Sequence, residues 1–192
     1  MRLNLKRYLS VWPVVFLITA LTGCAIQPLD FSVNENDLAI SQQKINAELK
    51  SISVTLSDAG TDETRFAGGT GRIISPFKNA LEDALVRKAI FDDEARSKVS
   101  ITVKLKEFEM TDLFGNNFKT VAAYSVIERK TGRKIYSTEV TSFANPFSSA
   151  PLGGQARVRE ILNLSLRNNI KDFIAKLESV APEINRMLVS GY

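Results

Sequence analysis

The side chain best suited to covalent chemistry in this sequence is the thiol of Cys24, the single cysteine among 192 residues. Its thiolate would be a nucleophile, but the chain contains no histidine, the residue that most often serves as the general base. Ser-His-Asp and Cys-His catalytic sites and histidine-ligated metal sites are therefore excluded. The G-x-S-x-G and H-E-x-x-H motifs are also absent. We expect a protein that is not an enzyme and carries no cofactor or metal, with a Ser-Lys or two-carboxylate enzyme as the alternative that stays open.

Cys24 follows an N-terminal segment with the features of an export signal. Arg2, Lys6 and Arg7 precede an apolar run at residues 14–21, and small residues follow that run. The run is too short for a stable transmembrane helix, which needs about 20 apolar residues. The segment therefore predicts export of the chain.

The residues Leu21-Thr22-Gly23-Cys24 resemble the lipobox of bacterial lipoproteins. The resemblance implies cleavage after Gly23, a diacylglycerol thioether on Cys24 and acylation of the new amine. Each buried acyl CH₂ contributes about 0.8 kcal/mol, so two or three chains would hold the protein firmly on a membrane. Ala25, rather than Asp, implies the periplasmic face of the outer membrane under the enterobacterial sorting rule. The alternative is a secretory signal with an incidental cysteine, but a lone cysteine in an exported protein calls for an explanation.

The charge balance changes once the signal is removed. Residues 1–23 hold three of the 25 basic residues and no acidic ones, so the mature chain has 22 basic and 21 acidic residues. The high isoelectric point thus belongs largely to the signal and gives no reason to expect nucleic-acid binding. We expect a signal at 1–23, a lipidated tether at 24–36 and one periplasmic domain at 37–192.

Hydrophobic periodicity predicts alternating strands and two amphipathic helices. The expected strands lie at 51–57, 99–110, 119–129 and 133–143, and the expected helices at 75–91 and 155–179, with a short helix at 37–50 and a last helical turn near 184–188. This order predicts a two-layer α+β sandwich, in which an antiparallel sheet of about four strands packs both main helices on one face. The predicted core includes Leu81, Leu85, Val103, Leu105, Ile170 and Phe173.

A cluster of basic residues flanks the turn expected between the last two strands. Arg129 and Lys130 precede Thr131-Gly132, and Arg133 and Lys134 follow it. A tight hairpin would bring all four charges to one tip, where they could meet anionic lipid headgroups or an acidic protein surface. The alternative is a solvated turn whose charges prevent edge-to-edge aggregation of the sheet.

Two further clusters have chemically suggestive residue types without the matching spacing. The loop 68–72, Gly-Gly-Thr-Gly-Arg, has backbone amides suited to phosphate but lacks the GK[ST] of a P-loop. The run Asp92-Asp93-Glu94 has metal-ligand side chains but no known ligand spacing. We interpret the first as a loop and the second as a solvated helix end.

The order of predicted elements behind a lipobox resembles two groups of outer-membrane lipoproteins. One is the lipopolysaccharide-assembly lipoprotein that plugs its translocon, and the other is the YajG-type lipoproteins; the local likeness is chiefly at 141–146, Thr-Ser-Phe-Ala-Asn-Pro. The resemblance implies a non-enzymatic accessory or assembly factor, held by its lipid anchor and bound to another envelope protein. A binding module for anionic lipid or glycan is the alternative. The sequence gives no oligomeric state.

Overall fold

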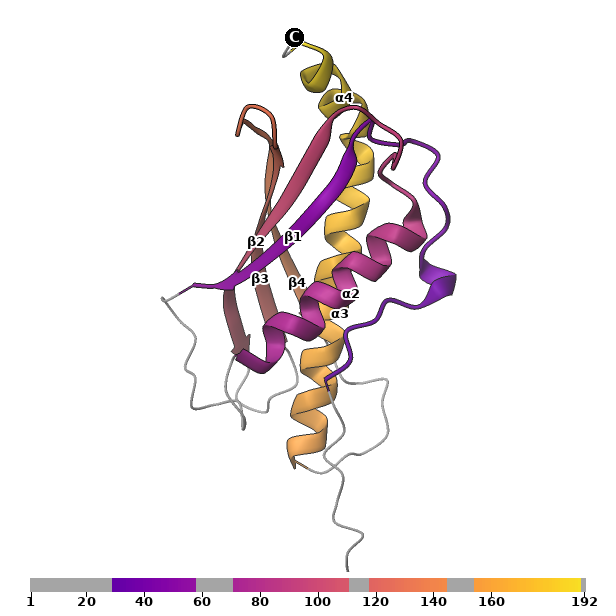
Figure 1. The fold of residues 1–192 in the computed structure, drawn as a ribbon. Helices are drawn as coiled ribbons and strands as arrows, with labels where there is room; N and C mark the ends of the chain where they lie inside the picture. The colour runs from indigo at the N-terminus through magenta and orange to yellow at the C-terminus, as the bar shows by residue number, and fades with distance from the viewer. Residues whose placement is uncertain (1–28, 58–70, 111–117, 145–153, 191–192) are drawn as a thin grey trace, which may run out of the picture.

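The computed structural model describes residues 29–57, 71–110, 118–144 and 154–190 (Figure 1). These residues form one four-stranded sheet with helices packed on it, which confirms the predicted α+β class. The elements are η2 (Glu35–Asp37), β1 (Glu48–Leu56), α2 (Gly71–Lys88), β2 (Lys98–Met110), β3 (Phe118–Glu128), β4 (Lys134–Ala144), α3 (Gly154–Ser179) and α4 (Ala181–Val189).

The sheet is mixed rather than wholly antiparallel. Its strands lie in the order β1-β2-β3-β4, with β1 parallel to β2 and the other two pairs antiparallel. The predicted strand direction is therefore wrong for one pair. The reason is the helix α2 between β1 and β2, because a helical crossover between neighbouring strands returns the chain to the same end of the sheet. The turn between β3 and β4 has the expected left-handed glycine, Gly132, with a φ of 72°.

Two of the helices predicted for the first half of the chain differ from the structure. The helix α2 begins at Gly71 rather than at Ser75, so Pro76 lies within it instead of opening it. The predicted helix at 37–50 is absent; Ile45 forms a parallel bridge to Phe91, and β1 begins at Glu48. The pairing of Ile45 with Phe91, which is distant in the sequence, outweighs the weak helical spacing of the apolar residues in this segment. The helices α3 and α4 lie where the sequence predicts a long helix and a last helical turn.

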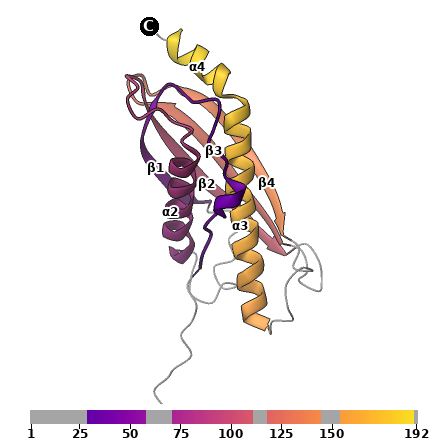
Figure 2. The same cartoon turned by 90° about the vertical axis from the view of Figure 1, so that its right-hand side faces the viewer.

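The helices α2 and α3 cover one face of the sheet (Figures 1 and 2). Side chains that alternate along the strands point toward them, and all six predicted core residues are at most 2% exposed. The core prediction is therefore confirmed. On the opposite face, Ser53, Thr102, Ser125 and Ser137 occupy paired positions across the four strands.

Buried hydrogen bonds fix α3 against β3 and β4. The Tyr124 hydroxyl donates to Asn169 Oδ1 at 2.7 Å, and the Asn169 amide donates to the Val140 carbonyl at 3.0 Å. One turn earlier, the hydroxyls of Thr120 and Ser165 lie 2.7 Å apart. Burial raises the pKa of Tyr124 well above its ordinary value, so the phenol stays a neutral donor. Because polar groups at this depth are costly without partners, these pairs permit one register of α3 on the sheet.

A segment that we call the strap, residues 29–47, crosses the outside of the two main helices before β1 (Figure 2). Phe31 and Val33 are buried, and the ring of Phe31 lies 6.4 Å from that of Phe77 in α2. Glu178 of α3 accepts a hydrogen bond from Ser41 of the strap at 2.7 Å and pairs with Lys88 of α2 at 2.9 Å. The hydrogen bonds from Lys88 and Ser41 lower the pKa of Glu178. Phe31 and Val33, within the range that the sequence interpretation assigns to a tether, therefore pack as part of the folded domain.

Truncation to alanine should lower the free energy of unfolding at a buried position of α2 and leave it nearly unchanged at an exposed one. Leu85 is 2% exposed, and its neighbour Val86 is 71% exposed. We expect Leu85→Ala to lower the free energy of unfolding by about 2–5 kcal/mol, because it leaves a cavity. We expect Val86→Ala to change it by less than about 0.5 kcal/mol. Urea denaturation of both variants checks this, and equal effects would contradict the packing described.

Candidate functional site

The structure places some of the predicted site residues and not others. Gly23 and Cys24 lie outside the described residues, so the lipidation site stays a prediction from the sequence. Of the glycine-rich loop, residues 68–70 also lie outside them, while Gly71 and Arg72 begin α2. The run 92–94 lies in the turn after α2, and no group of three potential metal ligands occurs among the described residues.

The four basic residues of the β3–β4 turn are all exposed at one end of the sheet. Two backbone hydrogen bonds close this turn, from the Gly132 amide to the Glu128 carbonyl and from the Glu128 amide to the Arg133 carbonyl, each at 2.9 Å. The Arg129 amide donates to the carbonyl of Lys98, at the start of β2, at 2.8 Å. The hairpin predicted from the sequence is thus present, and its tip is attached to the neighbouring strand.

Arg133 has a structural role that the sequence reasoning missed. Its guanidinium donates to the Met187 carbonyl in the last turn of α4 at 2.6 Å, and it lies 3.7 Å from the carboxylate of Glu128. Glu128 is 3% exposed and also accepts a hydrogen bond from the Thr131 hydroxyl at 2.6 Å. A cation at the C-terminal end of a helix is favourable, because unpaired carbonyls and the helix dipole are negative there. Arg133 therefore holds the turn and α4 together.

The turn and α4 make one exposed surface, which we call the basic end. Its exposed basic residues are Arg129, Lys130, Arg133 and Lys134 of the turn and Arg186 of α4, and Glu183 of α4 is an exposed acidic residue. Met187 and Val189 of α4 add exposed apolar side chains, at 42% and 71%. The inner side of α4 is buried through Ala181, Ile184 and Leu188. Figure 1 shows that α4 and the β3–β4 hairpin lie at the same end of the domain.

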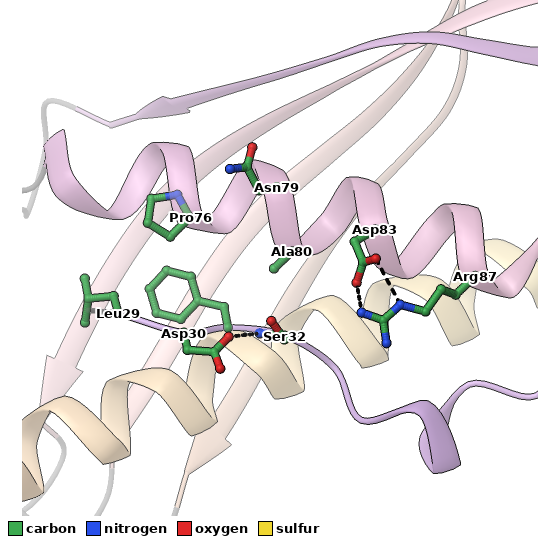
Figure 3. A pocket seen from close by; sticks show the side chains of 9 residues that line it. Leu29, Asp30, Ser32, Pro76, Asn79, Ala80, Asp83 and Arg87 are labelled. Carbon is green, nitrogen blue, oxygen red and sulfur yellow. Dashed lines mark hydrogen bonds and ion pairs between the residues drawn. The ribbon is translucent and has the colours of Figure 1, made fainter. Parts of the chain in front are cut away.

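A groove of about 500 Å³ lies between the beginning of the strap and α2 (Figure 3). It is lined by Leu29, Asp30, Phe31, Ser32, Pro76, Asn79, Ala80, Asp83 and Arg87. Its charged groups have partners inside the protein. Hydrogen bonds from the side chain of Ser32 and from its amide, which lies 2.9 Å from Asp30 Oδ1, lower the pKa of Asp30, and Asp83 pairs with Arg87. A ligand would have to compete with these pairs, so the groove is a weaker candidate than the basic end.

Two polar atoms on α3, Asn163 Oδ1 and Arg167 Nε, are buried without a hydrogen-bond partner. The charge of Arg167 contributes to lowering the pKa of Asp30, which places the start of the strap near the middle of α3.

Comparison with known proteins shows the fold and no family. No family model and no curated protein matches the sequence. A solved structure from Xanthomonas campestris, described as DUF330, has a TM-score of 0.54 at 10% identity and covers 88% of this chain and 97% of its own. A hypothetical protein from Chlamydia trachomatis has a TM-score of 0.52 at 9% identity, with 70% and 98% covered. At these identities the likeness concerns the fold alone.

A third match bears the name of a lipoprotein. It is a minor lipoprotein from Acinetobacter baumannii, with 14% identity, 71% and 92% of the two chains covered, and a TM-score of 0.34. This similarity is too low to support an argument about the present chain. The resemblance to the lipopolysaccharide-assembly and YajG-type lipoproteins stays a prediction. No helix in the described part of the chain is long and apolar enough to cross a membrane.

Removal of the Arg133 side-chain charge should loosen α4 while preserving the sheet. Arg133→Gln takes away the donor to Met187 and leaves the buried Glu128 carboxylate with fewer partners. We expect a loss of about 1–3 kcal/mol in the free energy of unfolding and faster amide exchange in α4. Lys134→Gln, one residue further on, is the matched control and should change the stability by less than about 0.5 kcal/mol. Unchanged exchange in α4 for Arg133→Gln would show that the contact holds nothing in place.

Proposed function

We propose that this protein is a non-enzymatic lipoprotein on the periplasmic face of the outer membrane, where it serves as an accessory or assembly factor bound to another envelope protein. The observation that best supports this proposal is the small number of residues between the lipobox cysteine and the packed strap. Four residues separate Cys24 from Leu29, and the strap is already buried at Phe31. The lipid anchor therefore belongs to a rigid domain with little free linker.

The length of that chain supports a particular orientation of the domain. An extended residue spans at most about 3.6 Å, so five steps from Cys24 to Leu29 reach roughly 18 Å. The start of the strap lies beside α2 and near Arg167, in the half of the domain away from α4 (Figure 2). From Arg167 to the end of α3 the helix rises about 18 Å, and α4 lies beyond. If α3 stands roughly perpendicular to the membrane that holds Cys24, the basic end points away from that membrane.

This orientation favours a partner in the periplasm over the anchoring membrane itself. Electrostatic attraction to lipid headgroups falls off within a Debye length, about 8 Å at physiological ionic strength. The second candidate function, a binding module for anionic lipid or glycan, is supported by the exposed basic residues of the turn. It requires the ligand to be brought to the far end of the domain.

Processing and sorting of the expressed chain test the anchoring. We expect Cys24→Ser to accumulate as an unlipidated precursor, because acyl transfer needs the thiol and the chain has no other cysteine. In an enterobacterial host, Ala25→Asp should be processed normally but stay in the inner-membrane fraction of a density gradient. Normal processing and membrane retention of Cys24→Ser would contradict the lipoprotein assignment.

Purification of the lipidated protein from solubilised envelopes separates the two functions. A stoichiometric membrane-protein partner is the result expected for an assembly factor. Copurification of lipid or glycan alone would support the binding module instead and contradict the proposal.

A further inference from the structure

We infer that the outer edge of β1, at residues 51–56, accepts an extended strand of another envelope protein, which adds one strand to the sheet. This inference rests on the proposed function and deepens it, because it names the surface and the chemistry of the partner segment. It follows from the backbone groups at this edge, the absence of charge along it, the contrast with the opposite edge and the position of α2.

The backbone of β1 directs part of its hydrogen-bonding groups away from the sheet. The Ser57 amide donates to the Leu105 carbonyl of β2 at 2.8 Å, and residues 51–56 pair with β2 in an unbroken register. Because consecutive residues of a strand direct their amides and carbonyls to opposite sides, Ile52, Val54 and Leu56 direct theirs away from β2. In the described part of the chain, no other segment forms hydrogen bonds with these groups. They can therefore pair with a further strand.

The exposure of the core side chains marks β1 as an open edge. Ile52 and Val54 are 6% and 9% exposed, whereas their partners in β2, Ile101 and Val103, are 0% and 2% exposed. Leu56, at the end of β1, is only half-buried, although it packs against the core. A strand added beside β1 would cover these side chains, and burial of apolar surface favours association.

The outer part of β1 lacks the features that usually prevent strand addition. Residues 51–56, Ser-Ile-Ser-Val-Thr-Leu, have no charge, and their small polar side chains on the uncovered face alternate with apolar side chains on the core face. Exposed edge strands are commonly protected by charged residues, proline or a bulge. The register shift and the ion pair of Lys50 with Glu48 lie before this stretch and leave it unprotected.

The opposite edge of the sheet, formed by β4, is occupied by side chains of α3. The Lys176 ammonium donates to the Glu139 carbonyl at 3.0 Å, and the Asn168 amide donates to the Phe143 carbonyl at 2.9 Å. A strand that arrived at β4 would have to displace these donors. The edge of β1 is therefore the one that can be extended.

A strand without a helix fits this edge better than a second copy of the chain does. The helix α2 packs mainly on β1 and α3. Pairing of β1 with its copy would place one α2 over each of two strands about 4.8 Å apart, whereas packed helices need about 8–10 Å between their axes. A membrane, in turn, offers no row of peptide groups to pair with. The expected partner is an extended protein segment whose apolar side chains alternate with small polar ones.

Site-specific photo-crosslinking of the full lipidated protein in cells tests this inference. A benzophenone amino acid would replace Thr55 in one variant and Thr141 in the control, since both are exposed threonines on edge strands, β1 and β4. We expect a discrete protein adduct from position 55 and none of that adduct from position 141. The cross-linked peptide, identified by mass spectrometry, should lie in an uncharged stretch with alternating apolar residues.

Removal of one backbone donor makes the result specific. Leu56→Pro takes away an amide that faces away from β2, and proline is tolerated at such edge positions. Leu56→Ala is the matched control, because it loses the same side chain and keeps the amide. We expect the adduct yield from position 55 to be about tenfold lower in Leu56→Pro than in Leu56→Ala. Ser53→Lys, a change on the uncovered face, should also lower the yield, and it serves as the test if thermal melting shows that Leu56→Pro does not fold.

Several outcomes would overturn the inference. They are an adduct to a second copy of this chain, to lipopolysaccharide or to phospholipid, an equal protein adduct from position 141, no adduct at all, and a yield that a folded variant of either kind leaves unchanged. If a membrane-protein partner nevertheless copurifies, the proposed function stands and only this edge is wrong.

Discussion

The packing of α3 on β3 and β4 is the constraint on which the rest of this structure depends. The hydroxyl of Tyr124 in β3 donates a hydrogen bond to Asn169 in α3, and the ring of Tyr124 stacks on that of Phe173 with centroids 3.9 Å apart. Each of these polar groups would be costly if α3 slid along the sheet, because its partner would be lost in a buried environment. The register of α3 then determines where α4 begins, and α4 in turn meets Arg133 at the tip of the hairpin. A hydrogen-bonded contact in the core therefore positions a surface at the end of the domain.

The strands and the two main helices follow from the sequence, since their apolar residues recur with periods of two and of about 3.6. The pairing of β1 with β2 is not specified by the pattern of either strand, but once they are neighbours the predicted helix between them makes them parallel. The segment 38–49 is similar: its apolar spacing suits a helix, but Ile45 pairs with Phe91, far away in the sequence. The sequence does not predict the strap for the same reason. Phe31 and Val33 lie in a polar stretch, and their burial depends on tertiary contacts with the helices.

The candidate surface shows the same division between local and tertiary information. The sequence places four basic residues around a turn, and the exposed tip with Gly132 at a φ of 72° has that form. The sequence treats the four charges as equivalent, and the structure separates them. Arg133 contacts Met187 and Glu128 and so joins the turn to α4, and Arg129, Lys130 and Lys134 are exposed at the same end of the sheet. The position of α4 depends on how α3 ends, so the contact between Arg133 and the Met187 carbonyl has no local signal in the sequence.

The central claim is that the lipid anchor and the basic end lie at opposite ends of the domain, and depth-dependent fluorescence quenching tests it most directly. In the proposed anchored form the lipid occupies Cys24, so a cysteine introduced at Ser32 or at Val189 would be the one thiol open to a fluorophore in each variant. In proteoliposomes with headgroup-labelled quencher lipids, the account predicts strong quenching at position 32, near the start of the strap, and little at position 189. Equal quenching at both positions, or stronger quenching at position 189, would contradict it.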